Sequence, residues 1–290
     1  MNLSIVITLF NRKDLVENAI ASCLLLNLPG VSYEVIIVDD GSTDKPRTIL
    51  EPYIKDGSIT YYEKKNGGPA SAKNFGARKA NGTFIIFLDS DDIFSGPNAL
   101  CEFRKVEKLN VDFAFSKSVI VKNGQTLDQE TTPYVGIDLY DYVLQYPLNY
   151  PGKQLYILQR KRFIDVGGFN EKHRWGDAML FWRRYLLNCT FLEMTEPTCI
   201  YTMTEDSVSR NKSDGYYLKV LTTITDTYTD NKKIIESSGY SHNWMLVLIG
   251  VSLLAKDYCS FIKYFLLSLA NPLKMIRSMI YVYNRRKNRG

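Results

Sequence analysis

Three aspartates, Asp89, Asp91 and Asp92, stand within four positions directly after the apolar run 84–88. Five apolar residues in succession predict a strand that is buried on both faces. Carboxylates this close repel one another, and they become favourable together when a divalent cation binds among them. Because carboxylate oxygens are preferred ligands of Mg²⁺ and Mn²⁺, we predict a metal-assisted site for the phosphates of a nucleotide. An Asp-rich turn that caps a helix is the alternative interpretation.

A second acidic group, the pair Asp39 and Asp40, follows the strand-like run 34–38. Residues 3–9 form a third run of this kind. Open α/β sheets bind their ligands at the carboxyl ends of their strands. The ends of these three runs are therefore the expected place for a nucleotide.

The order of the elements that position these residues predicts an α/β fold. Between residues 3 and 92, strand-like segments alternate with segments that have the apolar spacing or the small residues of packed helices. This alternation is typical of a mainly parallel sheet with right-handed crossovers. Beyond residue 92 we expect helices at 98–108, 161–166 and 176–187, and strands at 111–115, 155–158, 191–194 and 199–203.

The composition argues against several classes of protein. The 290 residues carry 36 basic and 31 acidic side chains, an excess of +5 that is too small to indicate a nucleic-acid partner. The five cysteines include no CxxC pair, so their spacing predicts neither a zinc site nor a disulfide framework. The N-terminal residues lack the basic and apolar segments of a signal peptide, and we expect a cytoplasmic protein.

Residues 213–290 differ in composition from residues 1–212 and predict a helical extension to the main domain. Within this extension one helix is expected at 216–236, and two apolar runs follow at 244–255 and 261–270. Neither run reaches the roughly 20 apolar residues that a membrane-spanning helix needs.

Basic side chains gather near the end of this extension. The last six residues hold four of them, and Lys274 and Arg277 precede that cluster. The apolar runs therefore allow two interpretations. They form a helical hairpin packed on the main domain, or they attach to the inner face of the plasma membrane with the help of these cations.

Several segments occur in a recognisable order along the chain. They read SIVITLFN at 4–11, IIVDDGSTD at 36–44, FLDSDD at 87–92, GGFNE at 167–171 and WGDAMLFWR at 175–183. Together they resemble the family-2 glycosyltransferases, which are inverting enzymes with the GT-A fold. The last two segments are especially similar to the spore-coat polysaccharide transferases.

The resemblance covers about residues 3–210 and implies a Rossmann-like, mixed and mainly parallel sheet flanked by helices. It implies a nucleotide-sugar-binding half at 1–95 and an acceptor-binding half at 96–212. The implied reaction is the metal-dependent, inverting transfer of a hexosyl or N-acetylhexosaminyl group from a UDP-type nucleotide-sugar. The implied acceptor is a glycan or lipid-linked hydroxyl in bacterial surface-polysaccharide synthesis.

In the nucleotide half, the family pattern gives each matched position a role. Thr8 and Phe10 would contact the base or the uridine, and Asp40 would accept a hydrogen bond from uracil N3. Asp39 matches the neighbouring acidic position. Lys73 stands where related enzymes place a cation that contacts the base or a phosphate.

In the Asp-rich turn, Asp91 would bind the Mn²⁺ or Mg²⁺ that bridges the diphosphate. Asp89 would bind the ribose or support the metal ion, and Ser90 would contact the nucleotide. Breaking the sugar–phosphate bond puts negative charge on the departing nucleoside diphosphate. A cation held there stabilises that charge as a Lewis acid.

In the acceptor half, Asp177 would be the general base that takes the proton of the attacking hydroxyl. The alternative is a carboxylate at a helix N-terminus, favoured there by the helix dipole. Trp175 would contact the acceptor because it adjoins Asp177. Ser207, Ser209 and Arg210 would form a loop that closes over the diphosphate, or else an ordinary solvated linker.

Two positions depart from the family pattern. Gly176 stands where the family often has Glu, and Phe10 stands where it often has Tyr, so stacking is retained without the hydroxyl. Two other functions stay open. One is a nucleotide- or glycan-binding module without catalysis, and the other is a sugar nucleotidyltransferase, although residues 8–14 lack the Gly-rich phosphate loop of that class.

Overall fold

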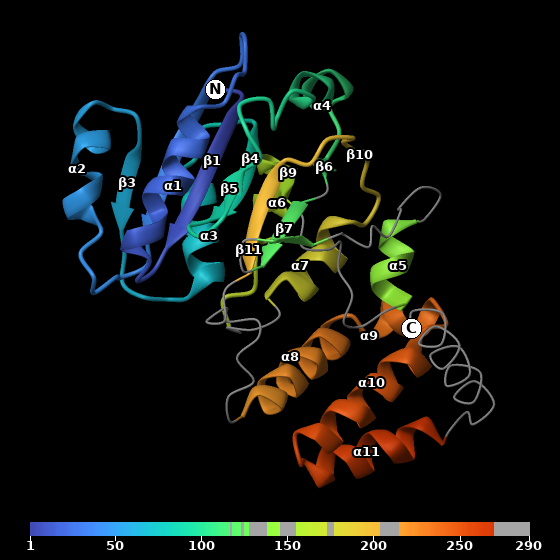
Figure 1. Cartoon of the computed structure of the whole chain (residues 1–290). Helices are drawn as coiled ribbons and strands as arrows, with labels where there is room; N and C mark the ends of the chain where they lie inside the picture. The colour runs from blue at the N-terminus through green and yellow to red at the C-terminus, as the bar shows by residue number, and fades with distance from the viewer. Residues whose placement is uncertain are drawn as a thin grey trace. The chain divides into compact units, whose positions relative to one another are not determined.

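The computed structural model describes residues 1–116, 118–122, 125–127, 138–145, 155–172, 177–203 and 215–269 (Figure 1). The chain divides into two compact units. The first, called the sheet unit below, comprises Met1–Pro133, Gly152–Arg174 and Arg184–Glu205. The second, called the helical unit, comprises Tyr134–Pro151, Trp175–Arg183 and Asp206–Gly290.

A seven-stranded sheet with the order β10-β6-β9-β4-β1-β2-β3 forms the centre of the sheet unit. The two strand pairs that include β9 are antiparallel, and the other four pairs are parallel. The predicted mixed, mainly parallel sheet is therefore confirmed. Its strands are β1 (Leu3–Leu9), β2 (Tyr33–Asp39), β3 (Thr60–Glu63), β4 (Phe84–Asp89), β6 (Phe113–Phe115), β9 (Tyr156–Gln159) and β10 (Phe191–Glu193).

A smaller sheet of four strands has the order β5-β11-β7-β8. Its strands are β5 (Ile93–Phe94), β7 (Ser118–Lys122), β8 (Gln125–Leu127) and β11 (Cys199–Met203). The first of them begins directly after Asp92 and pairs with β11, so this sheet fixes the exit of the Asp-rich turn. The sequence predicts β11 but not β5, because two residues are too few to show a periodic pattern.

Helices cover both faces of the large sheet. Ile5 and Ile7 of β1 belong to one apolar core with Val16 and Ile20 of the first helix, whereas Val6 points to the other face. Burial on both faces explains the continuous apolar runs of β1, β2 and β4. The helices of this unit are α1 (Lys13–Leu24), α2 (Arg47–Lys55), α3 (Pro69–Lys79), α4 (Phe103–Leu109) and α6 (Arg160–Asp165).

The small residues of α3 allow it to pack closely on the sheet, as the sequence predicts. A Cβ atom added at Gly76 would overlap Cγ1 of Val6, and it would lie 3.2 Å from Cγ2 of Val38. Only glycine therefore fits between α3 and strands β1 and β2. This contact sets the position of a helix that carries two side chains of the candidate site.

The helical unit is organised around the buried Trp244. Its indole Nε1 donates to the backbone oxygen of Leu144 at 2.8 Å. The Arg183 guanidinium lies 4.7 Å from the Trp244 ring and donates to the oxygen of Val143 at 2.8 Å. The helices are α5 (Leu139–Gln145), α7 (Asp177–Tyr185), α8 (Tyr216–Asp230), α9 (Lys232–Ser237), α10 (Ser241–Leu254) and α11 (Tyr258–Ser268), of which α7 ends in the sheet unit.

The single helix expected at 216–236 is two helices, and that prediction is wrong at Asn231. The Asn231 side chain donates to the backbone oxygen of Thr227 at 2.8 Å and so competes with the helical hydrogen bonds at this point. Among the residues that the structure describes, no helix is long and apolar enough to span a membrane.

Candidate functional site

The candidate site lies where β1, β2 and β4 end at one edge of the large sheet. Thr8 is the register partner of Asp89 on β4, and Leu9 is the partner of Asp39 on β2. Parallel pairing therefore brings the ends of three separate sequence motifs to one level. The next residue, Phe10, has 47% of its surface exposed, which leaves an aromatic face available at this edge.

Helix α3 places a cation beside the Asp-rich turn. Nζ of Lys73 lies 3.0 Å from Oδ1 of Asp89. The lysine side chain is only 19% exposed, whereas that of Asp89 is 51% exposed, so the carboxylate still faces solvent. The structure thus brings Lys73 and Asp89 together at this edge, and their roles in binding a ligand stay predictions.

The ionised form of Asp91 is disfavoured at this edge. Burial, and next the negative charge of Asp89, raise the pKa of Asp91, while Arg12 and Lys73 act in the opposite direction. A divalent cation bound to these oxygens would lower the pKa of Asp91 again, because a bound ion is the largest local charge in such a site. The chemistry of Asp89 and Asp91 therefore fits a metal ion.

Within the described ranges, no group of three or more His, Cys, Asp or Glu side chains is arranged to hold a metal ion. This finding is compatible with Mg²⁺ or Mn²⁺ held at a nucleotide. Mg²⁺ is usually bound through one or two carboxylates, and the phosphates of the substrate and water complete its coordination. Asp89 and Asp91 would supply these carboxylates, whereas Asp92, the third aspartate of the turn, is 8% exposed.

Asp40 is 3% exposed and accepts four hydrogen bonds from the protein. Nζ of Lys64 lies 2.5 Å from its Oδ1, and the backbone N–H of Gly68 donates to Oδ2 at 2.7 Å. The backbone N–H of Gly67 donates to both oxygens. These bonds fix the carboxylate against the start of α3. The N–H of a nucleobase would have to bind Asp40 in addition to these donors or replace one of them.

Asp39 holds the loop that follows β2. The backbone N–H of Ser42 donates to its Oδ1 at 2.8 Å, and the hydroxyl of Tyr61 donates to Oδ2 at 2.5 Å. Burial and this hydrogen bond raise the pKa of Tyr61, which keeps the phenol protonated as a donor. The observed contacts of Asp39 are all with the protein's own loop and neighbouring strand.

The loops after β1 and β2 are joined by Asn11, which the sequence analysis does not single out. Its backbone has φ 50°, a conformation that Asn tolerates better than most residues. Its N–H donates to Oγ of Ser42 at 3.0 Å, and its Oδ1 accepts from the N–H of Thr43 at 2.8 Å. The DGSTD segment therefore supports the loop that presents Phe10.

Asn74, the residue after Lys73, holds the GGFNE segment and is also missed by the sequence analysis. Its Nδ2 donates to the oxygen of Phe169 at 2.9 Å and to Oε1 of Glu171 at 2.8 Å. Its Oδ1 accepts from the N–H of Phe169 at 2.9 Å. A Cβ at Gly168 would overlap Asn74 Oδ1, which explains a glycine there. Helix α3 thus contacts both the Asp-rich turn and the acceptor-side segment.

The predicted site residues of the acceptor half belong to the helical unit or lie outside the described residues. Asp177 is the first residue of α7 and belongs to the helical unit. Its role as a general base stays a prediction. Trp175, Ser207, Ser209 and Arg210 lie outside the described residues.

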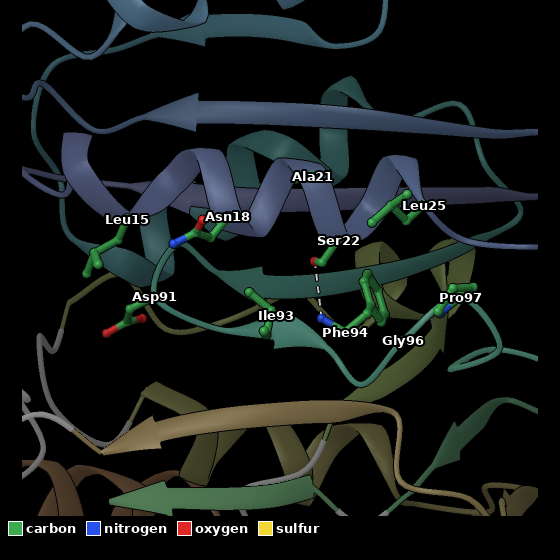
Figure 2. A pocket seen from close by; sticks show the side chains of 10 residues that line it. All are labelled: Leu15, Asn18, Ala21, Ser22, Leu25, Asp91, Ile93, Phe94, Gly96 and Pro97. Atoms are coloured by element: carbon green, nitrogen blue, oxygen red, sulfur yellow. Dashed lines mark hydrogen bonds between the residues drawn. The ribbon is translucent and has the colours of Figure 1, made fainter. Parts of the chain in front are cut away.

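A cavity of about 490 Å³ lies between α1 and the segment 91–97 (Figure 2). Asp91 is at one end and Pro97 at the other, and the lining between them includes Asn18 and Ile93. A hydrogen bond of 3.1 Å from the N–H of Phe94 to Oγ of Ser22 ties the two sides together. Of the predicted site residues that the structure describes, only Asp91 borders this cavity.

Comparisons with known proteins agree with this description. The model of a family described as glycosyl transferase family 2 matches residues 4–190. A poly(ribitol-phosphate) beta-glucosyltransferase of Bacillus spizizenii is 36% identical over 113 residues, which are 38% of this chain and 18% of that protein. The chain spans less than a quarter of the length of several curated relatives that it matches.

Solved structures share the fold. Residues 1–349 of Staphylococcus aureus TarS in complex with UDP-GlcNAc give a TM-score of 0.63 at 17% identity, over 91% of this chain and 89% of that chain. The mannosyltransferase PcManGT of Pyrobaculum calidifontis, in complex with GDP-Man and Mn²⁺, gives a TM-score of 0.56 at 14% identity, over 96% and 86%.

Proposed function

Because this chain belongs to glycosyl transferase family 2 and has the GT-A fold, we propose that it transfers a sugar from a nucleotide-sugar to an acceptor hydroxyl. The observation that carries the proposal is the sheet edge at which Thr8, Asp39 and Asp89 lie at one level, inside the segment that matches the family. At the same edge Lys73 supplies a positive charge for a diphosphate, and Asp91 supplies a carboxylate that would hold a cation beside it.

The proposed donor is a UDP-sugar, with a hexosyl or N-acetylhexosaminyl group to be transferred. The UDP-GlcNAc complex of TarS and the name of the Bacillus relative support this class of donor. Exposed Phe10 would stack on the base, and Thr8 would contact the uridine. Asp40 would accept a hydrogen bond from N3 of uracil, with Asp39 holding the loop beside it. Ser90 would contact the nucleotide.

Asp91 and Asp89 would hold Mn²⁺ or Mg²⁺, as the Mn²⁺ in the PcManGT complex suggests for this fold. When bound, such an ion stabilises the negative charge of the departing nucleoside diphosphate as a Lewis acid. Lys73 adds a second positive charge at the same edge and would bind a phosphate oxygen. Its pairing with Asp89 keeps the ammonium in place before the donor arrives.

On the acceptor side, Asp177 would take the proton of the attacking hydroxyl. Direct attack at C1 on the face opposite the diphosphate inverts the anomeric configuration, so an α-linked donor gives a β-linked product. The proposed acceptor is a glycan or a lipid-linked glycan of a bacterial surface polysaccharide. A lipid-linked acceptor would place the enzyme at the inner face of the plasma membrane.

The test is a screen of UDP-sugars with purified protein and MnCl₂, in which released UDP is measured with and without EDTA. We expect release with one donor class and its loss with EDTA. Asp91→Asn is expected to lose release, whereas Asp56→Asn is the matched control. Asp56 lies in an exposed turn, and asparagine can keep its hydrogen bond to the N–H of Ser58.

Two results would contradict the proposal. UDP-sugar binding by calorimetry without any turnover would favour a binding module. Formation of a nucleotide-sugar from a sugar phosphate and a nucleoside triphosphate would instead indicate a nucleotidyltransferase.

A further inference from the structure

Helix α11 exposes an apolar stripe to solvent. The stripe follows the spacing i, i+4, i+7, i+8 and i+11, which puts its members on one side of a helix. Leu253 and Leu254, at the end of α10, are also exposed, at 47% and 56%. The stripe consists of Tyr258, Ile262, Phe265, Leu266 and Leu269, with exposed fractions of 62%, 55%, 42%, 60% and 46%.

The stripe is distinct from the side of α11 that packs inside the helical unit. That side carries Tyr264, which is 4% exposed and shares a hydrogen bond of 3.0 Å with Thr225 of α8. The helix therefore already has its core contacts, with α10 beside it (Figure 1). The stripe is additional apolar surface. Contiguous exposed apolar surface on a folded protein marks a place where another molecule binds.

The charge of the surrounding sequence indicates which kind of molecule binds the stripe. Residues 258–290 contain seven Lys or Arg and no Asp or Glu. The preceding 257 residues contain 29 basic and 31 acidic side chains, so the whole positive excess of the chain lies in this segment. Lys263 stands within α11 itself and is exposed. A second copy of the chain would bring two such segments together and repel, whereas an anionic lipid surface attracts them.

We propose that the apolar stripe of α11 binds the surface of an anionic lipid bilayer, with Lys263 among the headgroups. No helix of the described part of the chain can span a membrane, so α11 lies in the interface with its apolar side chains between the lipids. The basic residues of 270–290 add electrostatic attraction. An apolar anchor and a basic segment together supply the two signals that stable attachment needs.

This inference gives a physical surface to the membrane location that the proposed function assigns. It depends on α11 and its charge, not on the sugar or the acceptor. A vesicle-binding assay contains no nucleotide-sugar, so its failure would leave the proposed transfer reaction untouched, and a failed donor screen would leave membrane binding untouched.

The test is flotation of this chain with vesicles of pure phosphatidylcholine or of phosphatidylcholine mixed with the anionic lipid phosphatidylglycerol. We expect binding to the anionic vesicles that weakens with added salt. The double variant Ile262→Glu/Leu266→Glu is expected to reduce the partition coefficient about 30-fold or more. Leu218→Glu/Ile234→Glu changes two other exposed apolar residues of the same unit, which are 52% and 41% exposed, and should bind like wild type.

A second measurement does not depend on the folding of a variant. Cys259 is exposed beside the stripe, and a polarity-sensitive dye attached there reports its surroundings. In a background with Cys101→Ser and Cys189→Ser, the emission should shift to the blue when anionic vesicles are added. An unchanged spectrum would overturn the proposal.

Two other outcomes would also overturn it. One is equal flotation of wild type and the Ile262→Glu/Leu266→Glu variant. The other is a dimer in light scattering that dissociates in that variant, which would assign the stripe to a second copy of the chain.

Discussion

The sheet unit and the helical unit depart from ordinary burial in opposite ways. At the edge of the sheet, Asp40 is a buried carboxylate held by four protein hydrogen bonds, and half-buried Asp91 lies beside the charge of Asp89. In the helical unit, apolar side chains such as Ile262 and Leu266 face solvent. The charge of Asp91 is unfavourable in the free protein, and the exposed side chains of α11 leave apolar surface in contact with water. Each therefore marks a place where a partner is expected, a nucleotide diphosphate in the first unit and a lipid surface in the second.

The two regions also differ in how the chain specifies them. At the sheet edge, the register of the strands determines which residues lie together. Thr8 lies opposite Asp89 because β1 and β4 pair in this register. The stripe depends on the spacing of side chains along a single helix. Changes at the sheet edge are therefore expected to affect the reaction, and changes on α11 to affect location alone.

The sharpest challenge to this division is Asp177, which belongs to the helical unit but is assigned to the reaction. Asp177→Asn is expected to lower the rate of transfer by about 10²–10⁴-fold, because a positioned general base contributes that much. Donor affinity, measured by calorimetry, should stay within about twofold of wild type. Asp230→Asn, an exposed carboxylate at the end of α8, is the control. Near-normal turnover would leave Asp177 with the role of a helix-terminal carboxylate.

Asp91 tests the charge balance of the sheet edge. Asp91→Asn is expected to lower transfer about 100-fold or more, because it removes a ligand of the ion that stabilises the leaving group. Mn²⁺ should raise the melting temperature of wild type and leave that of the variant unchanged. An equal rise in both proteins would place the metal ion elsewhere.

The same variant has a pH signature. Because the pKa of Asp91 is raised in the folded state by burial and by Asp89, the folded protein holds this proton more tightly than the unfolded chain. Ionised Asp91 therefore destabilises the fold, and this penalty develops as the pH rises through the raised pKa. In the absence of metal, Asp91→Asn should melt above wild type at about pH 7 and alongside it at about pH 3–4. A pH-independent difference would rule out this cause.

Much of the sheet edge can be predicted from the sequence, because buried parallel strands give continuous apolar runs that stop at polar residues. Such runs locate the ends of β1, β2 and β4, and family motifs at those ends identify the fold. The contacts that hold the edge are not predictable in this way. Lys64, Asn74 and Asn11 bind partners that lie 24, 95 and 31 positions away in the sequence, and no periodic pattern marks them. The stripe of α11 resembles a buried helix face, and only its exposure distinguishes it.

Asn74 tests whether the acceptor-side segment depends on α3. Asn74→Ala would remove three hydrogen bonds at one buried side chain and leave their partners unsatisfied. We expect a loss of about 2–3 kcal/mol in the free energy of unfolding, measured by urea denaturation. Asn18→Ala, an exposed asparagine on α1, should cost less than about 0.5 kcal/mol. The hydrogen bond from Nδ2 of Asn74 to Glu171 lowers the pKa of that carboxyl group. In Asn74→Ala the pKa of Glu171 should rise toward its usual value.

The smallest change in stability is expected for Lys73→Met. This variant should affect binding of the nucleotide-sugar much more than the free energy of unfolding. The Lys73–Asp89 pair at 3.0 Å has a half-exposed carboxylate, so Lys73→Met should change the free energy of unfolding by less than about 1 kcal/mol. The KM for the nucleotide-sugar should nevertheless rise about tenfold or more, since a phosphate loses a cation. Lys161→Met removes a more exposed pair, the 2.6 Å contact with Asp165 within α6, and should change neither quantity. If both lysine variants destabilise equally and leave KM unchanged, Lys73 is an ordinary surface ion pair, and the sheet edge loses one of its two proposed phosphate contacts.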